Sequence, residues 1–177
     1  MEHWYLVHTK PSRERLVAVQ LYQRGFVVYL PLIWVSPVNP RASRERPYFP
    51  GYLFAKLDLQ SVGADVIRWS PGVKDLVEFY GELASISDAF VAELQQCLNR
   101  VRAVGGMAPD GARRADFLPV NQRPFEGYEG IFNARLLGAD RARILLACVQ
   151  QEFWRQSTQA RPTAGMTDDS AAPRPSR

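Results

Sequence analysis

The side chains best suited to chemistry are two cysteines, Cys97 and Cys148, and two histidines, His3 and His8. A metal site needs three or four ligands at related spacings, and these four residues stand at unrelated ones. The sequence also lacks a recognisable pairing of nucleophile with base and a glycine-rich phosphate loop. We therefore expect neither catalysis nor a bound metal or other cofactor. The apolar neighbours of both cysteines favour small core residues in a reducing cytosol.

The charged residues permit binding to nucleic acid without requiring it. The formal net charge is +4 and the pI is about 9.3. Three arginines, Arg41, Arg44 and Arg46, cluster in one proline-rich segment. Such a cluster can contact nucleic acid, but a solvated basic loop has the same composition. Both interpretations stay open from the sequence.

An aromatic turn and strand, Phe49-Pro50-Gly51-Tyr52-Leu53-Phe54, follows that segment. Alternation places Leu53, Ala55 and Leu57 on one face, which we expect to be the core. Tyr52 and Phe54 then point away from the core, together with Lys56. Exposed aromatics in such a row indicate a surface that another molecule covers. The alternative is that they pack beneath the helix that begins at Ser87.

The first hundred residues alternate between strand and helix patterns, which predicts a domain with both kinds of element. A helix opens at Pro11 and Ser12 and closes at Gly25, with Val17, Ala18, Leu21 and Tyr22 on one face. A second helix is capped by Ser87 and carries an apolar stripe from Phe90 to Val101. The other expected elements are strands over 4–9, 26–30, 33–38, 52–57 and 73–79, and a short helical stretch over 61–69.

The pattern changes after residue 103. Residues 104–113 read as a flexible linker, and residues 114–156 as short strands and turns that form a small barrel. The last of these strands is expected over Arg141–Val149, after a hairpin turn at 137–140. Residues 142–156 also suit a helix, because Leu, Ala, Gln, Glu and Arg favour one and no Gly or Pro interrupts. Residues 157–177 have the composition of a disordered tail.

Taken in order, these blocks resemble the NusG family, and more closely its specialised paralogs of the RfaH type, over about residues 3–155. The N-terminal part matches through Trp4–Lys10, Tyr29–Pro31, Phe49–Phe54, Pro71–Val73 and Leu76–Phe79. The stretch Pro124–Phe132 resembles a KOW module. The KOW motif residues are Pro124, Phe125, Gly127, Gly130 and Ile131.

The resemblance implies an α+β fold. An NGN α/β sandwich over 1–103, with an antiparallel sheet flanked by helices, would be linked through 104–113 to a small KOW β-barrel over 114–156. It implies a cytoplasmic, monomeric transcription elongation or antitermination factor with no membrane partner. The clamp helices of the largest RNA polymerase subunit are the expected partner. The residues assigned to polymerase binding are Tyr52 and Phe54, flanked by Phe79, Val91, Leu94 and His8.

Other partners follow from the same resemblance. Upstream or non-template DNA would face Lys10, Arg13, Arg15, Arg41, Arg44 and Arg46. A ribosomal protein or a termination factor could bind the KOW module. That last expectation is weakened because Ala115-Asp116, Arg123-Pro124 and residues 149–154 depart from the pattern of the general factor, which favours a specialised paralog.

Two alternatives remain. Residues 142–156 could form part of a helical hairpin that masks the polymerase site, as in RfaH. The chain could instead be a KOW-type RNA- or ribosome-binding module without a polymerase role, which predicts tight RNA binding by residues 114–156 alone.

Overall fold

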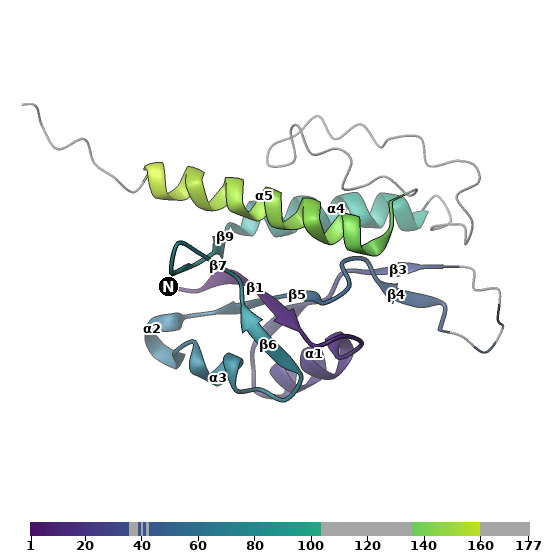
Figure 1. Ribbon diagram of the computed structural model, residues 1–177, viewed down its shortest axis with the longest axis horizontal. Helices are drawn as coiled ribbons and strands as arrows, with labels where there is room; N and C mark the ends of the chain where they lie inside the picture. Colours follow the sequence, from purple (N-terminus) through teal and green to yellow (C-terminus); the bar gives the residue numbers. More distant parts are fainter. Residues whose placement is uncertain (36–38, 40, 42, 104–135, 160–177) are drawn as a thin grey trace, which may run out of the picture.

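A computed structural model describes residues 1–35, 39, 41, 43–103 and 136–159 (Figure 1). The expected linker, the KOW motif residues 124–131 and residues 160–177 of the expected tail lie outside the described residues. Residues 157–159, also expected to be disordered, are the last residues of a helix. The strands are β1 (His3–Thr9), β2 (Val27–Tyr29), β3 (Leu32–Trp34), β4 (Glu45–Pro47), β5 (Tyr52–Leu57), β6 (Val73–Leu76), β7 (Glu78–Phe79), β8 (Glu82–Leu83) and β9 (Ser85–Ile86). The helices are α1 (Glu14–Gln23), α2 (Leu59–Val62), α3 (Asp65–Arg68), α4 (Asp88–Ala103) and α5 (Gly138–Gln159).

The main sheet is antiparallel and has β1 and β5 at its centre. Its order is β2-β5-β1-β6, and β9 pairs with β1 beside β6. The register sets Leu6 opposite Phe54 and His8 opposite Tyr52. Two further ribbons, β3-β4 and β7-β8, project from this sheet. The pairing places the aromatic strand β5 in the middle of the domain, where both of its faces can be covered.

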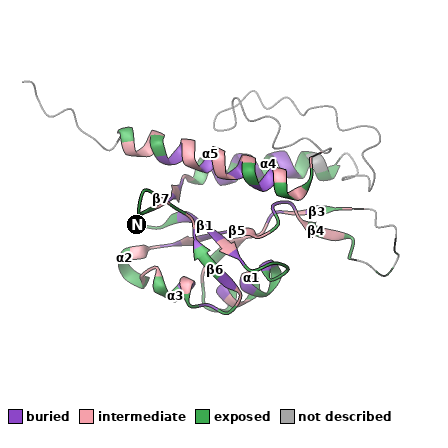
Figure 2. Cartoon of the chain, in the orientation of Figure 1, coloured by how far each residue is buried: buried purple, intermediate pink, exposed green. Residues whose placement is uncertain are grey.

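Alternation along β1 and β5 divides the interior into two cores (Figure 2). Tyr5, Val7, Leu53 and Ala55 pack with α1 and α3 on one side of the sheet. Trp4, Leu6 and Phe54 pack with α4 and α5 on the other side. Figure 1 shows the same arrangement, with α4 and α5 together above the sheet and α1 and α3 below it. Side chains one residue apart on a strand point to opposite faces, so β5 supplies both cores.

The N-terminal prediction of a sheet flanked by helices is confirmed. Some of its boundaries differ. The strand expected over 33–38 is limited to β3, and the helical stretch 61–69 is two short helices separated by Gly63, whose φ is +77°. Tyr22 does not join the buried face of α1, because it is 74% exposed. Among the described residues no helix is long and apolar enough to cross a membrane.

The strand expected over Arg141–Val149 is wrong, and so is the hairpin turn before it. Apart from Leu137, both segments belong to α5, which runs without a break from Gly138 to Gln159. Helix propensity favoured this outcome, and burial reinforces it. The buried apolar positions Leu145, Cys148, Val149 and Phe153 recur at helical spacing and join the core that contains Phe54. This segment therefore contributes a helix, not a strand, to the folded chain.

Candidate interaction surface

The turn before β5 is held by a buried carboxylate. Gly51 adopts a φ of +85°, a conformation that suits glycine. Its backbone N–H donates to Oε1 of Glu14 at 2.8 Å, and Glu14 is buried in the first turn of α1. The Gly51 carbonyl accepts from the N–H of Thr9 at 2.8 Å. These bonds fix where the aromatic strand starts relative to β1.

His8 and Tyr52 form a half-buried aromatic pair at the end of the two central strands. Their rings stack with centroids 4.8 Å apart and an interplanar angle of 12°. Burial, reinforced by the charge of Lys74, lowers the pKa of His8, while Asp75 opposes the shift. Burial also raises the pKa of the Tyr52 hydroxyl. Both rings are therefore neutral near pH 7, and the pair presents an aromatic surface to whatever contacts it.

Phe54 is not the exposed residue that strand alternation suggested. Its side chain is 0% exposed, and its ring lies 5.9 Å from Tyr29 and 6.5 Å from Phe90. The alternative, in which the aromatic face packs beneath the helix after Ser87, describes Phe54 correctly. The alternation itself was right, because Phe54 and Leu53 do point into opposite cores. The expectation missed the layer that covers this face.

The other residues assigned to polymerase binding lie on the same side of the sheet. Val91 and Leu94 are buried on the inner face of α4, and Phe79 is half-buried on β7. The Phe79 ring packs 5.9 Å from Phe153, which belongs to α5. All six assigned residues thus lie together on one side of the sheet. Of the six, His8, Tyr52 and Phe79 keep partial access to solvent.

The N-terminal end of α5 is joined to the turn before β5 by a buried arginine. Nε of Arg141 donates to the carbonyl oxygen of Tyr48 at 3.1 Å, and the guanidinium lies 4.6 Å from the Tyr48 ring centroid. Burial lowers the pKa of Arg141 and raises that of Tyr48. Gly138 approaches so closely that a Cβ there would lie 2.6 Å from Cγ of Pro50. This end of α5 is therefore fitted to the Tyr48–Pro50 segment.

The C-terminal half of α5 is joined to the start of α4. The Ser87 hydroxyl donates to Oε1 of Glu152 at 2.7 Å, while its Oγ accepts from the N–H of Phe90. The Ser85 hydroxyl donates to Oε1 of Gln156 at 2.8 Å. Outside this polar row, Trp154 packs 5.2 Å from Tyr80 in the turn between β7 and β8. Hydrogen bonds and one aromatic contact therefore surround the apolar centre of the interface between α5 and the rest of the domain.

Both thiols are buried in the core that α4 and α5 form with the sheet, Cys97 on α4 and Cys148 on α5. Burial raises the pKa of Cys148 to about 12, and burial together with the nearby Glu93 raises that of Cys97 to about 12. Thiols in this state are unreactive, as the sequence suggested for core cysteines. Cys148 thus reports on whether α5 is in place.

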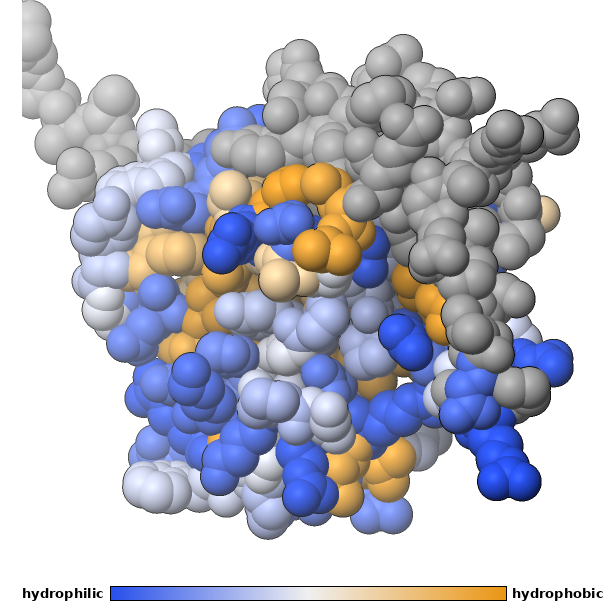
Figure 3. Space-filling model, turned by 45° about the vertical axis from the view of Figure 1, so that its right-hand side comes forward, coloured by the Kyte–Doolittle hydropathy of each residue, from blue (hydrophilic) through white to orange (hydrophobic). Residues whose placement is uncertain are grey.

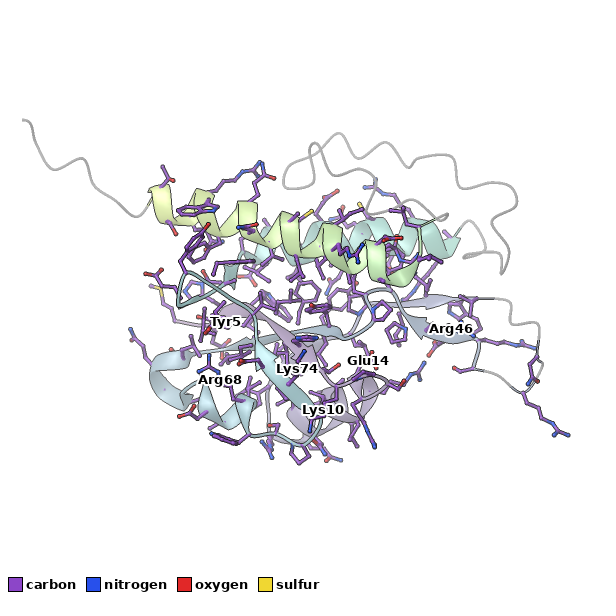
Figure 4. All side chains as sticks on the ribbon, in the orientation of Figure 1. Tyr5, Lys10, Glu14, Arg46, Arg68 and Lys74 are labelled. Carbon is purple, nitrogen blue, oxygen red and sulfur yellow. The ribbon has the colours of Figure 1, made fainter. Side chains whose placement is uncertain are left out.

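The cations predicted to bind nucleic acid form two groups, one at the start of α1 and one at the β3-β4 ribbon. An ion pair between Arg15 and Glu45 joins the two regions. Nη2 of Arg15, on α1, lies 3.1 Å from Oε2 of Glu45 on β4 and also donates to the Glu45 carbonyl. Lys10 lies near the start of α1, and Arg46 lies out on the β3-β4 ribbon (Figure 4). Arg15 is therefore a link between the groups, and its charge is already partnered. The remaining cations, Lys10, Arg13, Arg41, Arg44 and Arg46, are exposed.

The residues that sequence reasoning did not assign are those of α5 that cover the face, chiefly Leu145, Cys148, Val149 and Phe153. Their spacing of i, i+3, i+4, i+8 is typical of one face of a helix. The prediction of a strand rested on the resemblance of the preceding stretch to a KOW β-barrel. Arg141 and Gly138 carried no sequence signal for their contacts, because both contacts are made across more than eighty residues of chain.

Comparisons with known proteins identify the family of the N-terminal part of the chain. A family model described as "Transcription termination factor nusG" matches residues 2–95, which is more than half of the 177 residues. Among solved structures, one from the work titled "Domain interaction in Thermotoga maritima NusG" is 19% identical, with a TM-score of 0.43. The match covers 56% of this chain and 59% of that chain. No curated protein sequence matches. Through residues 2–95, the chain belongs to the NusG family.

Proposed function

We propose that this protein is a non-enzymatic transcription elongation or antitermination factor, and that it binds RNA polymerase through the face that carries His8, Tyr52 and Phe79. In the folded chain α5 lies on this face. The proposed site is therefore partly covered, and polymerase binding requires α5 to move away. The observation that supports this proposal is the convergence of the six assigned residues on the side of the sheet that α5 contacts.

The apolar character of the covered face supports a binding role. When α5 leaves, the core cluster that contains Phe54, Phe90 and Leu94 loses the side chains that α5 contributes to it, and its apolar surface becomes accessible. Apolar surfaces of that kind mark sites where another protein binds, and buried aromatic anchors commonly supply most of the binding energy. Because the chain belongs to the NusG family, RNA polymerase is the partner that we propose for this surface.

Competition between α5 and the polymerase follows from this arrangement. A site that is open in only a fraction of molecules binds its partner with an affinity reduced by that fraction. A substitution that loosens α5 without touching the site should then strengthen polymerase binding. A substitution in the site should weaken binding whether α5 is docked or not.

The test measures binding of the full chain to immobilised core RNA polymerase. We expect Leu145→Ala, which removes a buried α5 side chain, to bind more tightly than wild type. Adding Tyr52→Ala to Leu145→Ala should cost about 2 kcal/mol of binding, roughly thirty-fold. Tyr52 is a better probe than Phe54, because truncating the fully buried Phe54 would also remove about 3–5 kcal/mol from the fold.

Leu137→Ala is the matched control, because Leu137 precedes α5 and its side chain is exposed. It should bind polymerase as wild type does. The proposal fails if Leu145→Ala frees α5, as seen by hydrogen exchange, and polymerase binding does not increase. It also fails if Tyr52→Ala leaves binding unchanged in the Leu145→Ala background.

A further inference from the structure

The outer face of α1, on the side of the molecule away from α5, is unusually apolar for a surface helix. Val17 and Leu21 are buried against the sheet, as expected for a helix that covers one face. Val19 lies two residues from each, a turn of about 200°, and so faces solvent. It is 55% exposed, and Leu16 and Tyr22, one turn away on either side, are also exposed. A helix that is apolar on both faces is normally covered on both.

Further apolar side chains are exposed on α3, next to the C-terminal end of α1. Nη1 of Arg24, at the C-terminal end of α1, donates to the Val66 carbonyl at 3.2 Å and to Oγ of Ser70 at 2.8 Å. These bonds hold the end of α1 against α3, where Val66 and Trp69 are exposed, Trp69 by 83%. Figure 3 shows apolar side chains at the lower end of the molecule, where α1 lies in Figure 1. We call Leu16, Val19, Tyr22, Val66 and Trp69 the lower apolar surface.

The charges around this surface are mainly positive. Arg13 and Arg24 flank α1 at its two ends. Most nearby carboxylates are engaged: Glu14 is buried on Gly51, Glu45 pairs with Arg15, and Asp75 and Glu78 pair with Arg68. Asp65, at the start of α3, is the exposed exception. Arg13 has no ion-pair partner among the described residues, and it stands at a helix N-terminus, where the macrodipole favours a negative charge.

We propose that the lower apolar surface binds an acidic amphipathic helix of a partner protein. The apolar side of that helix would cover Leu16, Val19 and Tyr22. Its carboxylates would meet Arg13 and Arg24, which are eleven residues apart, about 16 Å along the helix axis. A second copy of this chain fits less well, because antiparallel pairing of α1 with itself brings Arg13 of one copy against Arg24 of the other.

The experiment places the photo-crosslinking residue p-benzoylphenylalanine at position 19 of the full-length chain in the host cell. A second chain with the same residue at Gln60, exposed on α2, is the control. Mass spectrometry identifies the crosslinked peptide, which is then synthesised. Fluorescence anisotropy measures its affinity for wild type, Val19→Asp and Arg13→Glu.

We expect a crosslink specific to position 19 and a peptide with an apolar stripe and carboxylates at its ends. Val19→Asp should weaken its binding about ten-fold or more, since a charge replaces a buried aliphatic contact. Arg13→Glu should weaken it several-fold, and more so at low salt. Binding to core polymerase through the opposite face should not change in Val19→Asp, so this inference and the proposed function fail separately.

Several outcomes would overturn the inference. They are a crosslinking pattern equal to that of the Gln60 control, a crosslink to a second copy of this chain or to nucleic acid, and capture of a segment without acidic residues. An affinity that Val19→Asp does not change would overturn it as well.

Discussion

Leu145→Ala should release α5 from the sheet while the rest of the domain stays folded. Leu145 is 0% exposed and lies in the core shared by the sheet, α4 and α5. Replacing a fully buried leucine with alanine costs about 2–5 kcal/mol, from lost transfer energy and the cavity left behind. A central value of about 3 kcal/mol multiplies the population of undocked α5 about 150-fold. Alanine has a high helix propensity, so the effect arises from packing and not from the helix itself.

Hydrogen exchange followed by mass spectrometry measures this population directly. Amides of residues 138–159 should exchange about a hundred-fold faster in Leu145→Ala, because opening of α5 exposes them. Amides of β1 and β5 should keep their protection. Leu137→Ala makes the same chemical change at an exposed position next to α5, and its exchange should match that of wild type.

Two results would refute this reasoning. If α5 amides exchange at the wild-type rate in Leu145→Ala, the apolar contact does not hold the helix in place. If β1 and β5 lose protection as much as α5 does, the helix is an inseparable part of the fold and not a removable cover. In the second case the competition between α5 and the polymerase could not operate.

Two further predictions concern titratable groups on the same face. His8 has a lowered pKa in the folded chain, so protonation favours the unfolded chain and stability should fall as the pH drops below about 6.5 toward the folded value. Urea unfolding at pH 7.5 and 5.5 checks this, and an equal loss of stability in His8→Gln would contradict it. Cys148, with a pKa of about 12, should react very slowly with iodoacetamide at pH 8 in the native protein. Leu145→Ala should speed the reaction, and fast alkylation of the wild type would contradict the docked position of α5.

Much of the N-terminal domain could be predicted because local patterns and final structure agree there. The alternation through β5 placed Leu53 and Ala55 on one side and Phe54 on the other, and the register with β1 preserves that division. The glycine and proline of the turn at Pro50-Gly51 marked its position, since few residues adopt a positive φ. These features depend on neighbours within a few residues.

Whether the aromatic face of β5 is free or covered could not be read from that strand. Period-two alternation shows which side chains share a face of the strand, but it does not show what packs against either face. Only the tertiary structure decided this, because the cover comes from α4, which begins at Asp88, and from α5, which begins more than eighty residues after the strand. The contact with α5 also decided the state of residues 141–149. Their composition allowed helix or strand, and burial of Leu145, Cys148 and Phe153 against the Phe54 face stabilises the helix.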